Sequence, residues 1–116
     1  MRTTLQSTIF QEGRDLPWED AAPGIKRQVY GYDDIVMLVR VKFEKGAIGS
    51  LHDHPHTQVS YVESGEFELT IGKEKKVLKT GDGFYVPPNV VHGSVCIKPG
   101  VLIDVFSPLR EDFLMQ

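Results

Sequence analysis

The segment GAIGSLHDHPHTQVSYVESG, residues 46–65, contains three of the four histidines of this chain. Imidazole is the side chain that most often binds divalent first-row metals. Because alternate residues of a strand point to the same face of a sheet, His52 and His54 can both face a barrel interior. Gln58 has the same parity, although Pro55 interrupts strand pairing and makes parity beyond it only a guide. The segment is therefore a candidate metal site.

The fourth histidine, His92, lies far along the chain in the segment PPNVVHGS. It can join the first group only if the sheet folds back on itself. His56, next to Pro55, is expected in a loop or behind the ligands rather than among them. A short His-x-His pattern alone is typical of a solvated loop, so the metal prediction depends on the spacing of the whole pattern.

The rest of the chain predicts short strands separated by turns. Residues 35–43 are rich in β-branched side chains, and residues 66–71 alternate acidic with apolar side chains. Glycine, proline and aspartate mark expected turns at 64–65, 72–75, 80–83 and 98–100. No stretch is expected to form a helix long enough for a helical layer. The pattern predicts an all-β sandwich or barrel.

The composition is that of one ordinary globular domain, which we assign to residues 1–116. Thirteen Lys and Arg against 16 Asp and Glu give a formal charge of -3. This balance excludes a strongly basic nucleic-acid binder and a polybasic membrane module. Cys96 is the lone cysteine, and the sequence shows neither a membrane-spanning apolar run nor a secretory signal. We therefore expect a cytoplasmic protein that binds neither nucleic acid nor a membrane.

Two motifs at a characteristic separation resemble those of the cupin family. The histidine-rich segment quoted above is similar to the first cupin motif, with Gln58 in place of the usual glutamate. The segment GDGFYVPPNVVHGSVC, residues 81–96, resembles the second motif, with Asn89 and Cys96 in place of the usual glycine and asparagine. The resemblance covers about residues 29–108, which is most of the chain.

The resemblance implies a small cupin, a double-stranded β-helix or jelly-roll barrel with its core at 29–108 and an N-terminal arm at 1–24. It also implies one divalent transition metal (Zn, Ni, Mn or Fe), held by His52, His54, Gln58 and His92. With a neutral glutamine as a ligand, such a site keeps the full +2 charge of the metal, which favours an anionic ligand and Lewis-acid chemistry. We therefore expect non-redox chemistry on an acidic substrate.

The last strand-forming segment, VLIDVF, is apolar on both sides of Asp104. This carboxylate is expected to point into the barrel as a general acid or base; the alternative is an exposed position on the outer face. Phe106 has the same parity and could form an apolar wall. Arg110 follows at the barrel mouth, where its planar fork could bind a substrate carboxylate through two hydrogen bonds. The alternative is a surface ion pair with Glu111 or Asp112.

Two longer segments, FEKGAIGSLHDHPHTQVSYVESGEFELTIG and GVLIDVFSPLREDFL, are similar to a family of bacterial pectin-degradation cupins. Those proteins linearise 4,5-unsaturated monouronates, which pectate and alginate lyases release, into open-chain keto forms. The resemblance implies that Asp104 and Arg110 are catalytic and that Phe106 and Arg110 bind the substrate. It implies as partners a small anionic sugar acid and, as for many small cupins, a second copy of the chain in a homodimer.

Two other classes of function stay open at this point. One is a different metal-dependent cupin enzyme, either a dioxygenase or a polyketide cyclase; iron-dependent oxygen consumption would indicate the dioxygenase. The other is a non-catalytic cupin, either a sugar-acid-binding module or a barrel with a vestigial site. Tight metal-dependent binding without turnover would favour the binding module, and absence of bound metal after purification would favour the vestigial site.

Overall fold

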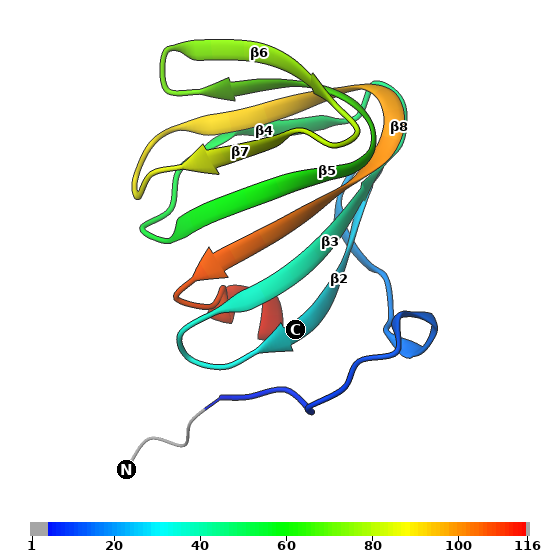
Figure 1. Cartoon of the computed structure of the whole chain (residues 1–116), viewed down its shortest axis with the longest axis vertical. Coiled ribbons are helices and arrows are strands. Elements are labelled where there is room, and N and C mark those ends of the chain that lie inside the picture. The colour runs from blue at the N-terminus through cyan, green and yellow to red at the C-terminus, as the bar shows by residue number, and fades with distance from the viewer. Residues whose placement is uncertain (1–4, 116) are drawn as a thin grey trace.

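The structure, a computed structural model that describes residues 5–115, is organised around two long strands, β5 (Thr57–Ile71) and β8 (His92–Ser107). These strands are antiparallel and pair with each other along their length. Both bend sharply at the right-hand side of Figure 1, so each contributes one half to each of two facing layers. The bends join the two layers into a continuous sheet that is folded on itself.

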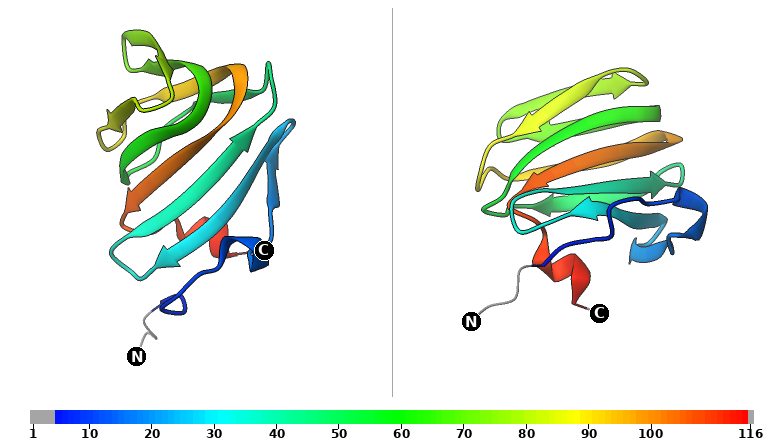
Figure 2. Two further views of the ribbon diagram at one scale, coloured as in Figure 1. Left: turned by 45° about the vertical axis from the view of Figure 1, so that its right-hand side comes forward. Right: turned by 60° about the horizontal axis from the view of Figure 1, so that its bottom comes forward.

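The remaining strands extend the two layers. They are β1 (Glu19–Ala22), β2 (Ile25–Tyr32), β3 (Met37–Phe43), β4 (Ile48–His52), β6 (Glu74–Lys79) and β7 (Gly83–Val86). The strand order is β1-β2-β3-β8-β5-β6, with β4 paired to β8 and β7 paired to β5. A short 3₁₀ helix, η1 (Gly13–Asp15), precedes β1, and a second one, η2 (Glu111–Leu114), lies beside the layer that contains β2 and β3 (Figure 2). The all-β barrel predicted from the sequence is confirmed.

The predicted N-terminal arm, residues 1–24, includes η1 and the edge strand β1, and its residues 1–4 lie outside the described part of the chain. Neither of the two 3₁₀ segments within residues 5–115 has the length or the apolar character needed to cross a membrane. The division into an arm and a barrel core stays a prediction.

The two long strands differ from the sequence expectation, which placed turns at residues 64–65 and 98–100. Both stretches lie inside continuous strands, with irregular register around Ser64. Gly65 has a φ of +87°, and a Cβ there would lie 2.7 Å from the Cα of Gly100. A Cβ on Gly100 would in turn overlap the Ser64 carbonyl. The glycines therefore mark a point where two bent strands come into close backbone contact, rather than the ends of strands.

The interior between the layers contains two apolar clusters and a cavity. One cluster consists of Ile25, Phe43, Ala47, Val62, Phe67, Leu69, Cys96 and Leu102. The other consists of Met37, Val39, Phe106 and Leu109. A cavity of about 410 Å³ is lined by side chains from β2, β3, β4, β5 and β8. The candidate site lies along this cavity.

Candidate metal centre

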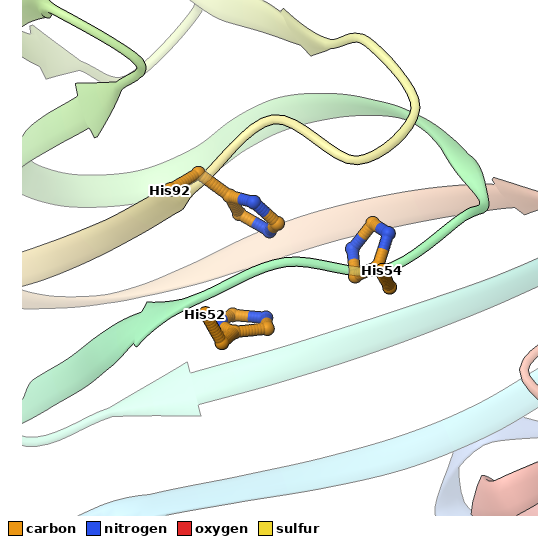
Figure 3. Close-up of side chains that lie close together, drawn as sticks. All are labelled: His52, His54 and His92. Atoms are coloured by element: carbon orange, nitrogen blue, oxygen red, sulfur yellow. The ribbon is translucent and has the colours of Figure 1, made fainter.

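Three histidines converge on one space in the described chain (Figure 3). His52 ends β4, His54 lies in the loop that follows, and His92 begins β8. The antiparallel pairing of β4 with β8 places His52 opposite His92. The candidate ligand nitrogens of the three rings all lie within 4.8 Å of one another. The structure thus brings together the two histidine segments that are distant in the sequence.

The hydrogen bonds of these histidines leave one ring nitrogen available in His52 and in His92, and His54 has a second contact through Gln58. In every case Nδ1 lies within hydrogen-bond distance of a backbone carbonyl oxygen. The partners of His52, His54 and His92 are the carbonyls of Ser50, His56 and Val90, at 2.8, 3.1 and 2.9 Å. Because a carbonyl oxygen only accepts, these contacts favour a proton on Nδ1 and a lone pair on Nε2 in His52 and His92. In His54 both ring nitrogens face a carbonyl oxygen, and a metal ligand at Nε2 would require the same tautomer. Metal-binding imidazoles are oriented in this way by their other nitrogen.

Gln58 supplies a fourth candidate ligand atom. Its side chain is buried, and its Oε1 lies 3.0 Å from Nε2 of His54. With the proton of His54 on Nδ1, these two facing atoms are both acceptors, so neither can donate a hydrogen bond to the other. A cation next to both lone pairs would make this arrangement favourable. Three imidazole nitrogens and an amide oxygen therefore fit a divalent transition ion, and this donor set suits Zn, Ni, Mn and Fe alike.

The electrostatics of the cluster also favour a neutral imidazole at His92. Burial lowers the pKa of His92, the nearby His52 and His54 lower it further, and the bond to the Val90 carbonyl opposes them. A metal binds the neutral ring, so a depressed pKa reduces competition from protons. His56 takes part only indirectly, because its carbonyl orients His54 while its own ring is outside the convergent group.

Asp104 lies on β8 and lines the cavity. It is the register partner of Ser60 on β5, and the Ser60 hydroxyl donates a hydrogen bond of 2.6 Å to its Oδ1. Burial raises the pKa of Asp104 to about 6, against the opposing effects of Ser60 and Arg110. The carboxyl group therefore faces the interior, not the outer face of the sheet.

Phe106 and Arg110 also line the cavity. Phe106 is buried, and its ring centroid lies 5.7 Å from that of His54. Arg110 donates two hydrogen bonds to Asp112, of 3.0 and 2.9 Å, which is one of the ion pairs considered as an alternative. Its guanidinium also stacks over Phe113, 4.3 Å from the ring centroid. Arg110 thus lines the cavity and forms the ion pair with Asp112, which uses only two of its five N–H donors.

Three side chains at the site are not predicted from the sequence: Arg27, Ser60 and Phe113. Arg27 lies on β2, lines the cavity and places its guanidinium 3.9 Å from the ring centroid of Phe113. Its Nε is buried without a hydrogen-bond partner. The parity that Arg27 shares with the buried Ile25 is the sequence signal that could place it on the inner face.

Comparison with known proteins defines the class of this chain. The family model described as the cupin domain matches residues 39–106, and the chain belongs to the cupin family. Within that family it resembles the pectin degradation protein KdgF of Dickeya dadantii (strain 3937). The two are 49% identical over 102 residues, which is 86% of this chain and 93% of that protein.

Solved structures agree with this placement. An RmlC-like cupin from Shewanella frigidimarina NCIMB 400 is 50% identical and superposes with a TM-score of 0.91, covering 93% of this chain and 97% of that one. KdgF from a Halomonas species is 38% identical, with a TM-score of 0.87 and coverage of 92% and 99%. The family and the fold predicted from the two motifs are therefore confirmed.

Proposed function

We propose that this protein is an enzyme of pectin or alginate breakdown that opens the ring of 4,5-unsaturated monouronates to give open-chain keto acids. The observation that carries the proposal is the meeting of the three-histidine cluster, Asp104 and Arg110 along one cavity. The similarity of this chain to KdgF, a pectin degradation protein, indicates the substrate class.

The charge of the cavity supports an anionic substrate. A divalent ion held by His52, His54, His92 and Gln58 would supply Lewis-acid polarisation of a substrate oxygen. Those four side chains are neutral and leave the charge of such an ion uncompensated. Arg110 and Arg27 also line the cavity, but Asp112 pairs with the first guanidinium at 2.9 Å and Glu19 lies 3.9 Å from the second, so such an ion would be the main uncompensated charge. A sugar carboxylate complements this excess of positive charge.

We assign substrate orientation to Arg110 and Phe106. Arg110 is held in place by Asp112 and by stacking on Phe113, which limits the entropy lost when it binds a carboxylate. Phe106 is almost fully buried next to His54 and lines the cavity, so we assign it the apolar wall behind the bound sugar. Together they would fix the substrate between the arginine and the histidine cluster.

We assign proton transfer to Asp104. In the ring opening, the bond between C1 and the ring oxygen breaks, the C1 hydroxyl loses its proton as the aldehyde forms, and the ring oxygen gains a proton as an enol. Conversion of the enol to the ketone then moves a proton from that oxygen to C4. The product is an isomer of the substrate, so neither an oxidant nor a nucleotide is consumed. A carboxyl group with a pKa of about 6 can accept and return such protons near neutral pH.

The direct test is the fate of a lyase-generated unsaturated monouronate. The protein should accelerate the loss of ultraviolet absorbance from its conjugated double bond beyond the slow spontaneous rate, and NMR should identify the open-chain keto acid. Oxygen uptake during the reaction would instead indicate a dioxygenase. Saturable binding without acceleration would indicate a sugar-acid-binding cupin, and either result would overturn the proposal.

A further inference from the structure

Ser60 links two groups of the site that do not share a strand. It is buried on β5, two residues after Gln58 and opposite Asp104 of β8. Its hydroxyl oxygen accepts a hydrogen bond from Nε2 of Gln58 at 3.0 Å, and its proton is donated to Oδ1 of Asp104 at 2.6 Å. The functional assignments above give Ser60 no role.

This chain of hydrogen bonds has a direction. A hydroxyl group has one proton, and an ionised carboxylate can only accept, so the proton of Ser60 points to Asp104. The lone pairs of Ser60 then face the amide of Gln58, and only the NH₂ end of that amide can satisfy them. The amide oxygen is left to face His54.

The opposite orientation of the amide would have two costs. It would place the carbonyl oxygen of Gln58 against the lone pairs of Ser60, leaving two buried acceptors without a donor. It would also let the NH₂ group donate to Nε2 of His54 and so occupy the lone pair that a metal needs. The terminal torsion of glutamine is soft and roughly two-fold, so only its hydrogen bonds select between the two orientations.

We infer that Ser60 is a positioning residue, which sets the amide of Gln58 so that oxygen rather than nitrogen faces the histidine cluster. The inference deepens the proposed function and rests on the assignment of Gln58 as a metal ligand. Loss of the Ser60 hydroxyl leaves the Asp104 carboxylate, which also interacts with the Gln58 side chain, as the remaining group that favours this orientation. The selection is then weaker, so the amide turns more readily and masks His54. Loss of a comparable group behind a metal ligand typically lowers metal affinity about 10- to 100-fold.

The first experiment measures Co²⁺ binding to the metal-free protein by visible absorption, without substrate. We expect Ser60→Ala to weaken Co²⁺ binding about 10- to 100-fold, and Ser60→Thr, which keeps the hydroxyl, to restore most of the affinity. The matched control is Ser64→Ala on the same strand, whose hydroxyl accepts from the Val101 amide at 3.2 Å and which should bind Co²⁺ as the wild type does. If Ser60→Ala fails to fold, Ser60→Cys, whose thiol is a weaker donor and acceptor, is measured in its place and should bind Co²⁺ less tightly than the wild type.

A second background separates positioning from general stability. In Gln58→Glu, the carboxylate has two equivalent oxygens and no orientation to select, so adding Ser60→Ala should change Co²⁺ affinity far less than in the wild-type background. Equal losses in both backgrounds, or wild-type affinity in Ser60→Ala, would overturn the inference. If Gln58→Ala itself binds Co²⁺ as tightly as the wild type, the ligand assignment under the proposed function falls as well.

Discussion

His52 and His92 are register partners in the pairing of β4 with β8, and their imidazole centroids lie 4.3 Å apart. The contact exists because β8 returns along the layer that β4 occupies, so the end of one strand meets the start of the other. Both rings direct Nδ1 to a carbonyl of their own segment, and this leaves the Nε2 atoms to face the shared space. A metal centre at this position depends on the fold, not on one local segment.

Replacement of His92 should abolish the metal centre. His92→Ala removes a ligand atom from the convergent group, so we expect metal affinity to fall by at least about 100-fold, the upper end of the loss seen for partners outside the ligand set. Isothermal titration with Zn²⁺ measures this loss. The control is His56→Ala, because the carbonyl of residue 56 that orients His54 survives the change. Equal losses in the two variants would argue against the three-histidine site.

Asp104→Asn should remove proton transfer at this position. The change conserves shape but eliminates the group with a pKa of about 6. We expect kcat to fall about 10²- to 10⁴-fold, as for loss of a general acid–base group. Asp82→Asn, in a turn where the carboxylate accepts from the Lys79 amide, is the control and should keep its activity. Undiminished turnover in Asp104→Asn would exclude this residue from the mechanism.

Arg110→Lys should weaken substrate binding although it conserves charge. Lysine has no planar fork, so it loses the paired bonds to Asp112 and the geometry for a carboxylate. We expect KM to rise about tenfold, equivalent to about 1.4 kcal/mol, with a smaller change in kcat. Arg14→Lys, an exposed arginine paired with Glu12, should leave both constants unchanged. An unaltered KM in Arg110→Lys would contradict the role assigned to the guanidinium.

A side chain at Gly65, where the backbones of β5 and β8 come into close contact, should lower the free energy of unfolding markedly. Gly65→Ala combines a positive φ with a Cβ 2.7 Å from backbone atoms, whereas Gly81→Ala has a φ of +94° but no atom within 4 Å. Backbone strain alone costs about 1–2 kcal/mol, and overpacking adds about 1–3 kcal/mol. Urea unfolding should therefore show Gly65→Ala to be the less stable variant. Equal free energies of unfolding for the two variants would contradict this, because they would mean that the backbones around Gly65 and Gly100 can move apart at little cost.

The sequence predicts the barrel and the pairing of His52 with His54 because both leave local signals. Alternating apolar residues predict the strands, and His52 and His54 share a parity that any strand would impose. The inward position of Asp104 also follows from its apolar neighbours. The approach of His92 has no local signal, since it depends on the pairing of β4 with β8, and only the spacing of two whole motifs indicates it.

Other features depend on contacts that no local pattern encodes. Glycine is typical both of turns and of close contacts between strands. At Gly65 the sequence therefore predicts a turn where the structure has a continuous strand. The approach of Arg27 to Phe113 joins β2 to the C-terminal 3₁₀ helix, and the link from Gln58 through Ser60 joins β5 to β8. In each case the structural role of a residue depends on a partner from a distant segment.

Metal-dependent turnover of a purified 4,5-unsaturated monouronate tests the central claim most directly. Absorbance of the conjugated double bond is followed with the protein as purified, after chelation, and after addition of Zn²⁺, Ni²⁺, Mn²⁺ or Fe²⁺ to the chelated protein. We predict that decay falls to the spontaneous rate after chelation and recovers with at least one of these ions. Acceleration that survives complete removal of metal, or no acceleration under any condition, would contradict the account.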